Sequence, residues 1–148
     1  MNPQILRKHG EDMLAADVLS SKCPSRRVLS HLTSRWGVLV MVALMLDGQQ
    51  RFSTLRRRVD GVSERMLAQT LQALEADGIV QRIDFKTVPP HVEYVLTPIG
   101  HEAAEKVTAL AGWAEDNLDR LLAAAQSGAT RDASNIVQLS GETHTEMS

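Results

Sequence analysis

Leucines at helical spacing mark the centre of the chain, within the stretch GVSERMLAQTLQALEADGIVQRI (residues 61–83). Steps of four and three residues place three of them on one narrow stripe of a helix, namely Leu67, Leu71 and Leu74. Ser63 precedes the stripe as a candidate N-cap, and Gly78 follows it where a left-handed C-terminal cap is favoured. The pattern predicts a short helix that packs through one face and exposes a polar face opposite.

Further helices are predicted upstream of this stripe. Pro24 stands where a helix begins, because proline is tolerated in the first turn. Residues 36–46 are apolar almost all round, which is typical of a buried central helix. Ser53 is a candidate N-cap for a short helix in which Leu55 and Val59 share one face.

After the central helix the pattern changes from helical spacing to alternation. Ile83 and Phe85 alternate with polar neighbours, and Val92, Tyr94 and Leu96 do the same after the loop KTVPPH. These segments predict a β hairpin. A long helix then starts at Pro98, with apolar residues in steps of three and four: Ile99, Ala103, Val107, Leu110, Ala114, Leu118, Leu121 and Ala125.

The order of these elements predicts a mainly α protein with a small β hairpin, arranged as a winged helix-turn-helix. Residues 1–22 form an N-terminal extension, in which EDMLAADVLS is compatible with a short helix at the dimer interface. Residues 23–126 form the winged helix-turn-helix domain with its C-terminal dimerisation helix. Residues 127–148 are small, polar and unpatterned, so we expect a disordered tail.

Composition narrows the choice of partners and compartment. The 148 residues suit one domain, and 16 basic against 18 acidic residues mean that any affinity for nucleic acid comes from a local patch. A single cysteine excludes an internal disulfide framework. We find no secretion signal, and the longest apolar run, VLVMVALML, is about half a bilayer span. We therefore expect a cytoplasmic protein with no membrane partner.

The polar face of the central helix carries residues suited to reading DNA bases. Arg65, Gln69 and Gln72 lie opposite the leucine stripe. Arginine pairs with guanine and glutamine with adenine through two hydrogen bonds in the major groove. A solvated helix face explains the same residues taken alone. Met66 fits either the edge of the core or contact with a thymine methyl group.

Basic residues gather beside this helix, although the chain as a whole is nearly neutral. Three consecutive arginines cannot all face one way on a helix, so we expect Arg56, then Arg57, to contact phosphates and Arg58 to form a surface salt bridge. Lys86 and His91 are expected at the hairpin tip. The candidate DNA-contacting residues are Ser53, Arg56, Arg57, Ser63, Arg65, Met66, Gln69, Gln72, Lys86 and His91.

These segments resemble one known family, the HxlR-type winged-helix regulators of bacteria and archaea. The resemblance covers residues 23–118 and rests on CPSRRVLSHLTSRW, RFSTLRR, VSERMLAQTLQALEADGIVQR and VPPHVEYVLTPIG. It implies a homodimeric transcription factor that binds double-stranded DNA, often as a repressor of a neighbouring gene. It also implies a winged helix-turn-helix with N- and C-terminal dimerisation helices. The chain departs from the family at His91, where a basic residue is usual, and at residues 33–35, where glycine-rich basic sequence is common.

The single cysteine has two interpretations. Cys23 is a small, inert side chain beneath the dimer helices, or it is a redox-sensing thiol like that of some family members. A thiolate would be favoured there by the helix start and by Arg26 and Arg27. Because the chain has no second cysteine, oxidation would give an intersubunit disulfide, a mixed disulfide or an adduct.

The long C-terminal helix has more apolar surface than one small core can cover. We expect Trp113, Leu118 and Leu121 to pack on a symmetry mate. A twofold dimer would present two reader helices to an inverted-repeat operator. A small-molecule effector between the dimer helices would be lined by Met41, Met45 and Trp113, residues that core packing explains equally well.

Other classes of function are less well supported. The five histidines are scattered without metal-ligand spacing, and the chain has no phosphate loop, GxSxG or HExxH. We therefore expect no catalysis, no metal and no cofactor. A winged helix that binds proteins without DNA is the remaining alternative, although exposed glutamines and arginines suit bases better than an apolar partner.

Overall fold

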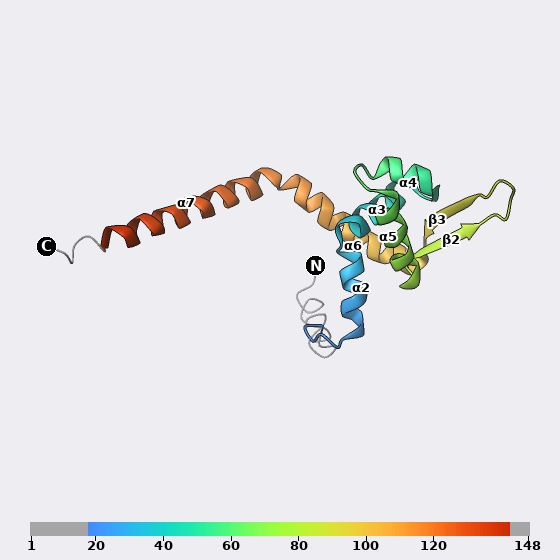
Figure 1. Ribbon diagram of the computed structural model, residues 1–148, viewed down its shortest axis with the longest axis horizontal. Helices are drawn as coiled ribbons and strands as arrows, with labels where there is room; N and C mark the ends of the chain where they lie inside the picture. Colours follow the sequence, from blue (N-terminus) through green and yellow to red (C-terminus); the bar gives the residue numbers. More distant parts are fainter. Residues whose placement is uncertain (1–17, 143–148) are drawn as a thin grey trace, which may run out of the picture. The chain divides into compact units, whose positions relative to one another are not determined.

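The computed structural model describes residues 18–142, and their side chains as far as residue 129 and at residue 131 (Figure 1). The chain divides into two compact units, one ending at Ala109 and the other beginning at Leu110. Most of the helix predicted within residues 11–20 lies outside the described residues. The elements are α2 (Pro24–Leu32), α3 (Arg35–Asp47), β1 (Gln50–Arg51), α4 (Phe52–Arg58), α5 (Glu64–Ala76), β2 (Val80–Asp84), β3 (Val92–Leu96), α6 (Pro98–Asp116) and α7 (Leu118–Glu142).

Helix α3 is the buried centre of the first unit, as its apolar sequence predicts. Ser34 caps it by accepting a hydrogen bond from the Gly37 amide over 3.1 Å. Val40, Met41 and Leu44 are at most 2 % exposed. No single helix within residues 18–142 is both long and apolar enough to cross a bilayer, and α2 and α3 reach that length only as a pair bent by 69°.

Helices α4 and α5 form the helix-turn-helix. Leu55 and Val59 are buried, which confirms their predicted shared face. The prediction that Ser53 caps α4 is wrong, because the helix begins at Phe52 and its N-cap is Arg51. The backbone leaves β1 at Arg51 and turns directly into the helix, so Ser53 already lies in the first turn.

Helix α5 is anchored as the leucine stripe predicts. Leu67, Leu71 and Leu74 are at most 1 % exposed. The Ser63 hydroxyl oxygen accepts a hydrogen bond from the Met66 amide over 3.1 Å, so the predicted cap is confirmed. After the helix, Gly78 adopts a φ of 76°, a conformation that only glycine takes without strain.

The predicted hairpin is present, and a short strand extends it. The strand order is β1-β3-β2, with antiparallel pairing throughout. Val80 pairs with Leu96 in the hairpin, and Gln50 pairs with Tyr94 at the other edge of β3. Strand β1 has only 2 residues, too few to show alternation in the sequence.

The start of α6 fits tightly against the end of α5. Thr97 Oγ1 donates to the Gly78 carbonyl over 2.5 Å and accepts from the Gly100 amide over 3.0 Å. A Cβ on Gly100 would lie 2.0 Å from the carbonyl oxygen of Ile79, so only glycine fits. This contact holds the start of α6 against the segment that joins α5 to β2.

The C-terminal helix differs from its prediction in two ways. Instead of one helix, α6 ends at Asp116 and α7 begins at Leu118. Asn117 stands between them, and its side-chain amide donates to the Trp113 carbonyl over 2.8 Å, as its backbone amide does over 3.0 Å. Helix α7 then runs to Glu142, through sequence expected to be disordered. Residues 127–142 contain no proline, so backbone hydrogen bonds continue.

Candidate nucleic-acid interface

The outer face of α5 presents the predicted base-reading residues to solvent. Arg65, Gln69 and Gln72 are exposed, and no hydrogen bond or ion pair ties their side chains to the rest of residues 18–142. Met66 is 40 % exposed. The Ser63 oxygen is used in capping, but its hydroxyl proton stays available for a phosphate. These side chains therefore meet a ligand without first breaking contacts.

The three arginines of α4 have different surroundings. Arg58 Nε donates to Asp47 Oδ2 over 2.6 Å, which confirms its prediction as a surface salt bridge. Arg56 Nη1 lies 2.8 Å from Glu64 Oε1, so the favoured phosphate contact is already paired. Arg57 is exposed and has no ionic partner in the described part of the chain. Ser53 is exposed on the same short helix.

Lys86 and His91 have different surroundings in the hairpin. Lys86 is exposed, with a φ of 54° and a backbone amide that donates to Asp84 Oδ1 over 2.8 Å. His91 lies at the base of the loop rather than at its tip, because its carbonyl accepts from the Phe85 amide over 3.0 Å. Its ring is half-buried and meets the Phe85 ring edge-on, with centroids 4.7 Å apart.

His91 belongs to a cluster that joins β1 to β3. Its Nε2 lies 2.5 Å from Glu93 Oε2, and its Nδ1 contacts the guanidinium group of Arg51. The hydrogen bond from His91 lowers the pKa of Glu93 from its ordinary value, helped by one from Gln49 and opposed by desolvation. The side chains of Arg51 and His91 are therefore already paired within the protein.

One basic residue of the wing was missed by the sequence interpretation. Arg82 is exposed on β2, opposite Tyr94 in the register, and it has no ionic partner among residues 18–142. Like Arg57, Arg65 and Lys86, it contributes an unneutralised positive charge to this surface. Alternation in the sequence already placed Arg82 on the polar side of the strand, which was the available signal.

Asp77 couples the end of α5 to α2, a contact that the sequence interpretation also missed. Its side chain is fully buried, with Oδ2 2.5 Å from His31 Nδ1 and Oδ1 3.4 Å from Arg27 Nη2. A carboxylate at a helix C-terminus is unfavourable by itself, so the Arg27 guanidinium and the contact with His31 offset it. The contact holds the reader helix at the end opposite Arg65.

Cys23 is the N-cap of α2, as predicted for a helix start. It is partly buried, and its Sγ lies 3.0 Å from Ser25 Oγ. The two arginines expected to favour a thiolate are directed elsewhere. Arg26 Nη1 donates to the Leu19 carbonyl over 3.2 Å, and Arg27 donates to Asp77.

The predicted dimerisation residues are exposed in the second unit. Trp113 is 53 %, Leu118 54 % and Leu121 41 % exposed. Leu110 and Leu122 add to this apolar surface. Of the candidate effector-lining residues, Met41 is fully buried in the core of the first unit and Met45 packs against that core.

No three histidine, cysteine, aspartate or glutamate side chains meet as a metal site in the described residues.

Comparison with known proteins identifies relatives that match most of the chain. The family model described as HxlR-like helix-turn-helix matches residues 31–121. YtfH of Escherichia coli (strain K12), described as an uncharacterized HTH-type transcriptional regulator, is 57% identical over 113 residues, which cover 76% of this chain and 89% of YtfH.

Two solved structures are similar in fold and sequence. That of ytfH from Salmonella typhimurium, a protein assigned to the transcriptional regulators, has a TM-score of 0.69 and 58% identity, covering 74% of this chain and 96% of that one. The redox regulator HypR in its reduced form has a TM-score of 0.59 and 38% identity, covering 66% of this chain and 96% of HypR.

Proposed function

The chain belongs to the HxlR-like helix-turn-helix family of transcriptional regulators, and on that basis we propose that it represses transcription as a homodimer bound to an inverted-repeat operator. The family consists of regulators and not of enzymes. The observation that carries the proposal is the outer face of α5. The side chains of Arg65, Gln69 and Gln72 on this face are exposed and make no hydrogen bond or ion pair within the described residues, while the opposite face is buried.

In the proposed complex α5 enters the major groove with its N-terminal end foremost. Arg65 pairs with a guanine and Gln69 with an adenine, each pairing contributing about 1–3 kcal/mol of discrimination against a wrong base. Gln72 lies nearest the C-terminal end of the three and contributes less. Met66 contacts a thymine methyl group from the edge of this face.

Phosphate contacts come from the elements on either side of α5. Arg57 contacts the backbone from α4, Ser63 donates its hydroxyl proton, and Lys86 contacts the backbone from the wing loop. Arg56 joins them when a phosphate replaces Glu64 as its partner. The ion pair between Arg56 and Glu64 is exposed and therefore weak. A phosphate offers Arg56 two oxygens, which favours replacement of Glu64 by the phosphate.

Dimerisation through the second unit explains its exposed apolar surface. Trp113, Leu118 and Leu121 are large side chains that a monomer would leave in water. A twofold pair buries them and sets two copies of α5 about one DNA turn apart. The operator is then an inverted repeat. We expect the protein to act in the cytoplasm.

A redox signal through Cys23 is a further part of the proposal. HypR, a similar structure, is a redox regulator by its description. The partly buried thiol stands at the start of α2, whose other end contacts Asp77 next to the reader helix. We expect an oxidant to release DNA from the wild type and not from Cys23→Ser. Unchanged binding after oxidation of the wild type would leave Cys23 with a structural role only.

The main test is DNA binding to the intergenic region upstream of the gene. We expect a specific shift, weakened about 30-fold or more by Arg65→Ala or Gln69→Ala, because each removes one base pairing of at least about 1 kcal/mol from both half-sites. Glu75→Gln, an exposed change at the far end of α5, is the matched control and should bind at least as well as the wild type. Equal affinity for unrelated DNA would refute sequence-specific reading by α5. No binding at all would favour a winged helix that binds proteins instead.

A further inference from the structure

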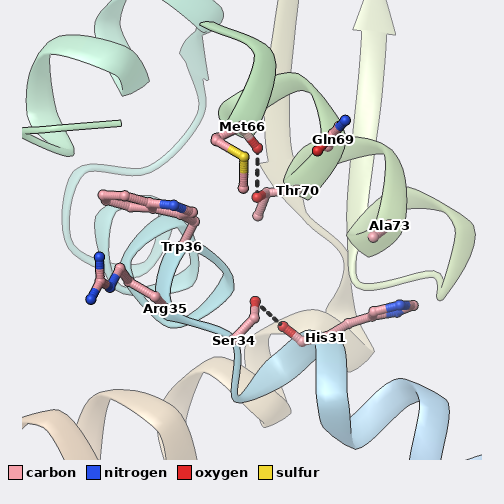
Figure 2. A pocket seen from close by; sticks show the side chains of 8 residues that line it. All are labelled: His31, Ser34, Arg35, Trp36, Met66, Gln69, Thr70 and Ala73. Carbon is pink, nitrogen blue, oxygen red and sulfur yellow. Dashed lines mark hydrogen bonds between the residues drawn. The ribbon is translucent and has the colours of Figure 1, made fainter. Parts of the chain in front are cut away.

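A cavity of about 450 Å³ lies between the α2–α3 connection and the reader helix α5 (Figure 2). Trp36 and Arg35 form one side of it and Ala73 lies on the opposite side, with Met66 above. Ligand pockets of small molecules have volumes of about 300–1,000 Å³, so the space suits a compact ligand. The cavity lies within the first unit and does not depend on a partner subunit.

The apolar wall of the cavity suits a flat ring. The indole of Trp36 is only partly buried, and the thioether of Met66 faces it from α5. Both side chains form favourable contacts with aromatic rings. The Arg35 guanidinium lies over the Trp36 ring, with its central carbon 5.7 Å from the ring centroid. A positive charge therefore lies against one face of the aromatic surface that lines the cavity.

The polar groups of the cavity favour an anion. Ser34 Oγ donates to the His31 carbonyl over 2.9 Å, and Thr70 Oγ1 donates to the Met66 carbonyl over 2.7 Å, so neither hydroxyl proton is available. Arg35 remains as the charged donor, and no aspartate or glutamate lines the cavity. Arg35 has no ionic partner among the residues that the structure describes.

We propose that this cavity is an effector site for a small aromatic carboxylate, which stacks on Trp36, pairs with Arg35 and weakens DNA binding when it is bound. The regulatory part rests on the proposed function. Met66 and Gln69 line the cavity and also belong to the proposed reading face of α5. A ligand that displaces Met66 and binds the Gln69 amide removes both side chains from their proposed contacts with DNA.

One wall of the cavity, Trp36, lies near the turn of the helix-turn-helix. A Cβ placed on Gly61, between α4 and α5, would lie 3.8 Å from Cη2 of Trp36. A shift of the Trp36 ring on ligand binding would therefore be felt at the turn between α4 and α5. By thermodynamic linkage, DNA must weaken ligand binding by the same factor by which the ligand weakens DNA binding.

Binding is tested without DNA, by quenching of Trp36 fluorescence in a Trp113→Phe background, which leaves one tryptophan in the chain. The probe is 4-nitrobenzoate, and 4-nitrobenzamide is its neutral counterpart of the same shape. We expect saturable quenching that is about tenfold tighter for the acid and falls to the level of the amide in Arg35→Gln. Equal quenching by both compounds, or no effect of Arg35→Gln, would overturn the proposal.

A second pair of variants tests the location. Ala73→Leu fills the cavity and should abolish quenching, whereas Ala76→Leu adds the same atoms at an exposed position of α5 and should not. Thermal melts verify that both variants are folded. Undiminished quenching in a folded Ala73→Leu protein would place the ligand elsewhere and overturn the assignment.

The regulatory step is measured with operator DNA. Saturating 4-nitrobenzoate should raise the apparent Kd for DNA several-fold in the wild type and leave it unchanged in Ala73→Leu. An unchanged Kd in the wild type would refute the effector role. Absence of DNA binding by the unliganded protein would instead refute the proposed function, and the quenching titration would still decide whether the cavity binds the acid.

Discussion

Two neighbouring arginines of α4 should respond differently to the same substitution. Arg57→Gln and Arg58→Gln each remove one positive charge from the same short helix. Arg57 is exposed without an ionic partner in the described chain, whereas Arg58 is held 2.6 Å from Asp47. We therefore expect only Arg57→Gln to remove a phosphate contact from the proposed complex.

The size of the effect follows from counterion release. Each phosphate contact contributes about 0.9 to the slope of log K against log salt, and a dimer loses two contacts, so Arg57→Gln should reduce the slope by about 1.8. A fourfold rise in salt would then weaken the wild type about tenfold more than the variant. For Arg58→Gln we expect the wild-type slope, because its charge is neutralised by Asp47 before DNA arrives.

The measurement is fluorescence anisotropy of a labelled operator over a series of potassium chloride concentrations, at one protein concentration range for all variants. Unrelated DNA of the same length serves as a second ligand. Phosphate contacts carry no sequence information, so the slope should fall equally on both. An unchanged slope in Arg57→Gln, or an equal fall in Arg58→Gln, would refute this assignment of the arginines.

Three further outcomes are expected. Gly100→Ala should lower the free energy of unfolding by about 1–3 kcal/mol, since its Cβ would meet the Ile79 carbonyl at 2.0 Å, and a thermal melt that shows no loss would contradict the close contact. The lowered pKa of Glu93 contributes stability that is complete above its ordinary value of 4.5 and is lost as the pH falls through the lower folded-state value. Glu93→Gln should therefore weaken the pH dependence of the free energy of unfolding between pH 4.5 and the lower folded-state pKa. Circular dichroism at acid pH measures this dependence, and an unaltered acid profile would argue against the pairing with His91. Leu121→Glu should give a monomer in sedimentation at micromolar concentration, and a variant that stays dimeric would remove the second unit from the interface.

Much of the fold was predictable because its signals are local. The stripe of Leu67, Leu71 and Leu74 follows from helical geometry alone, and the structure buries all three. Ser63 and Gly78 act through hydrogen bonds and backbone conformation within a few residues. The same local reasoning misplaced the cap of α4, where pairing of β1 with β3 decides the start of the helix.

The sequence by itself determined the order of elements, the buried face of α5 and the residue types on its outer face, since each depends on periodicity along a short segment. Tertiary structure decided which of the charges are available. The sequence predicted a salt bridge for Arg58, but only the fold shows that Glu64 also pairs with Arg56 and that Arg57 has no ionic partner in the described chain. The burial of Asp77 against His31, and the cavity beneath Met66, likewise depend on segments that only folding brings together, because contact between distant residues follows from packing and not from local pattern.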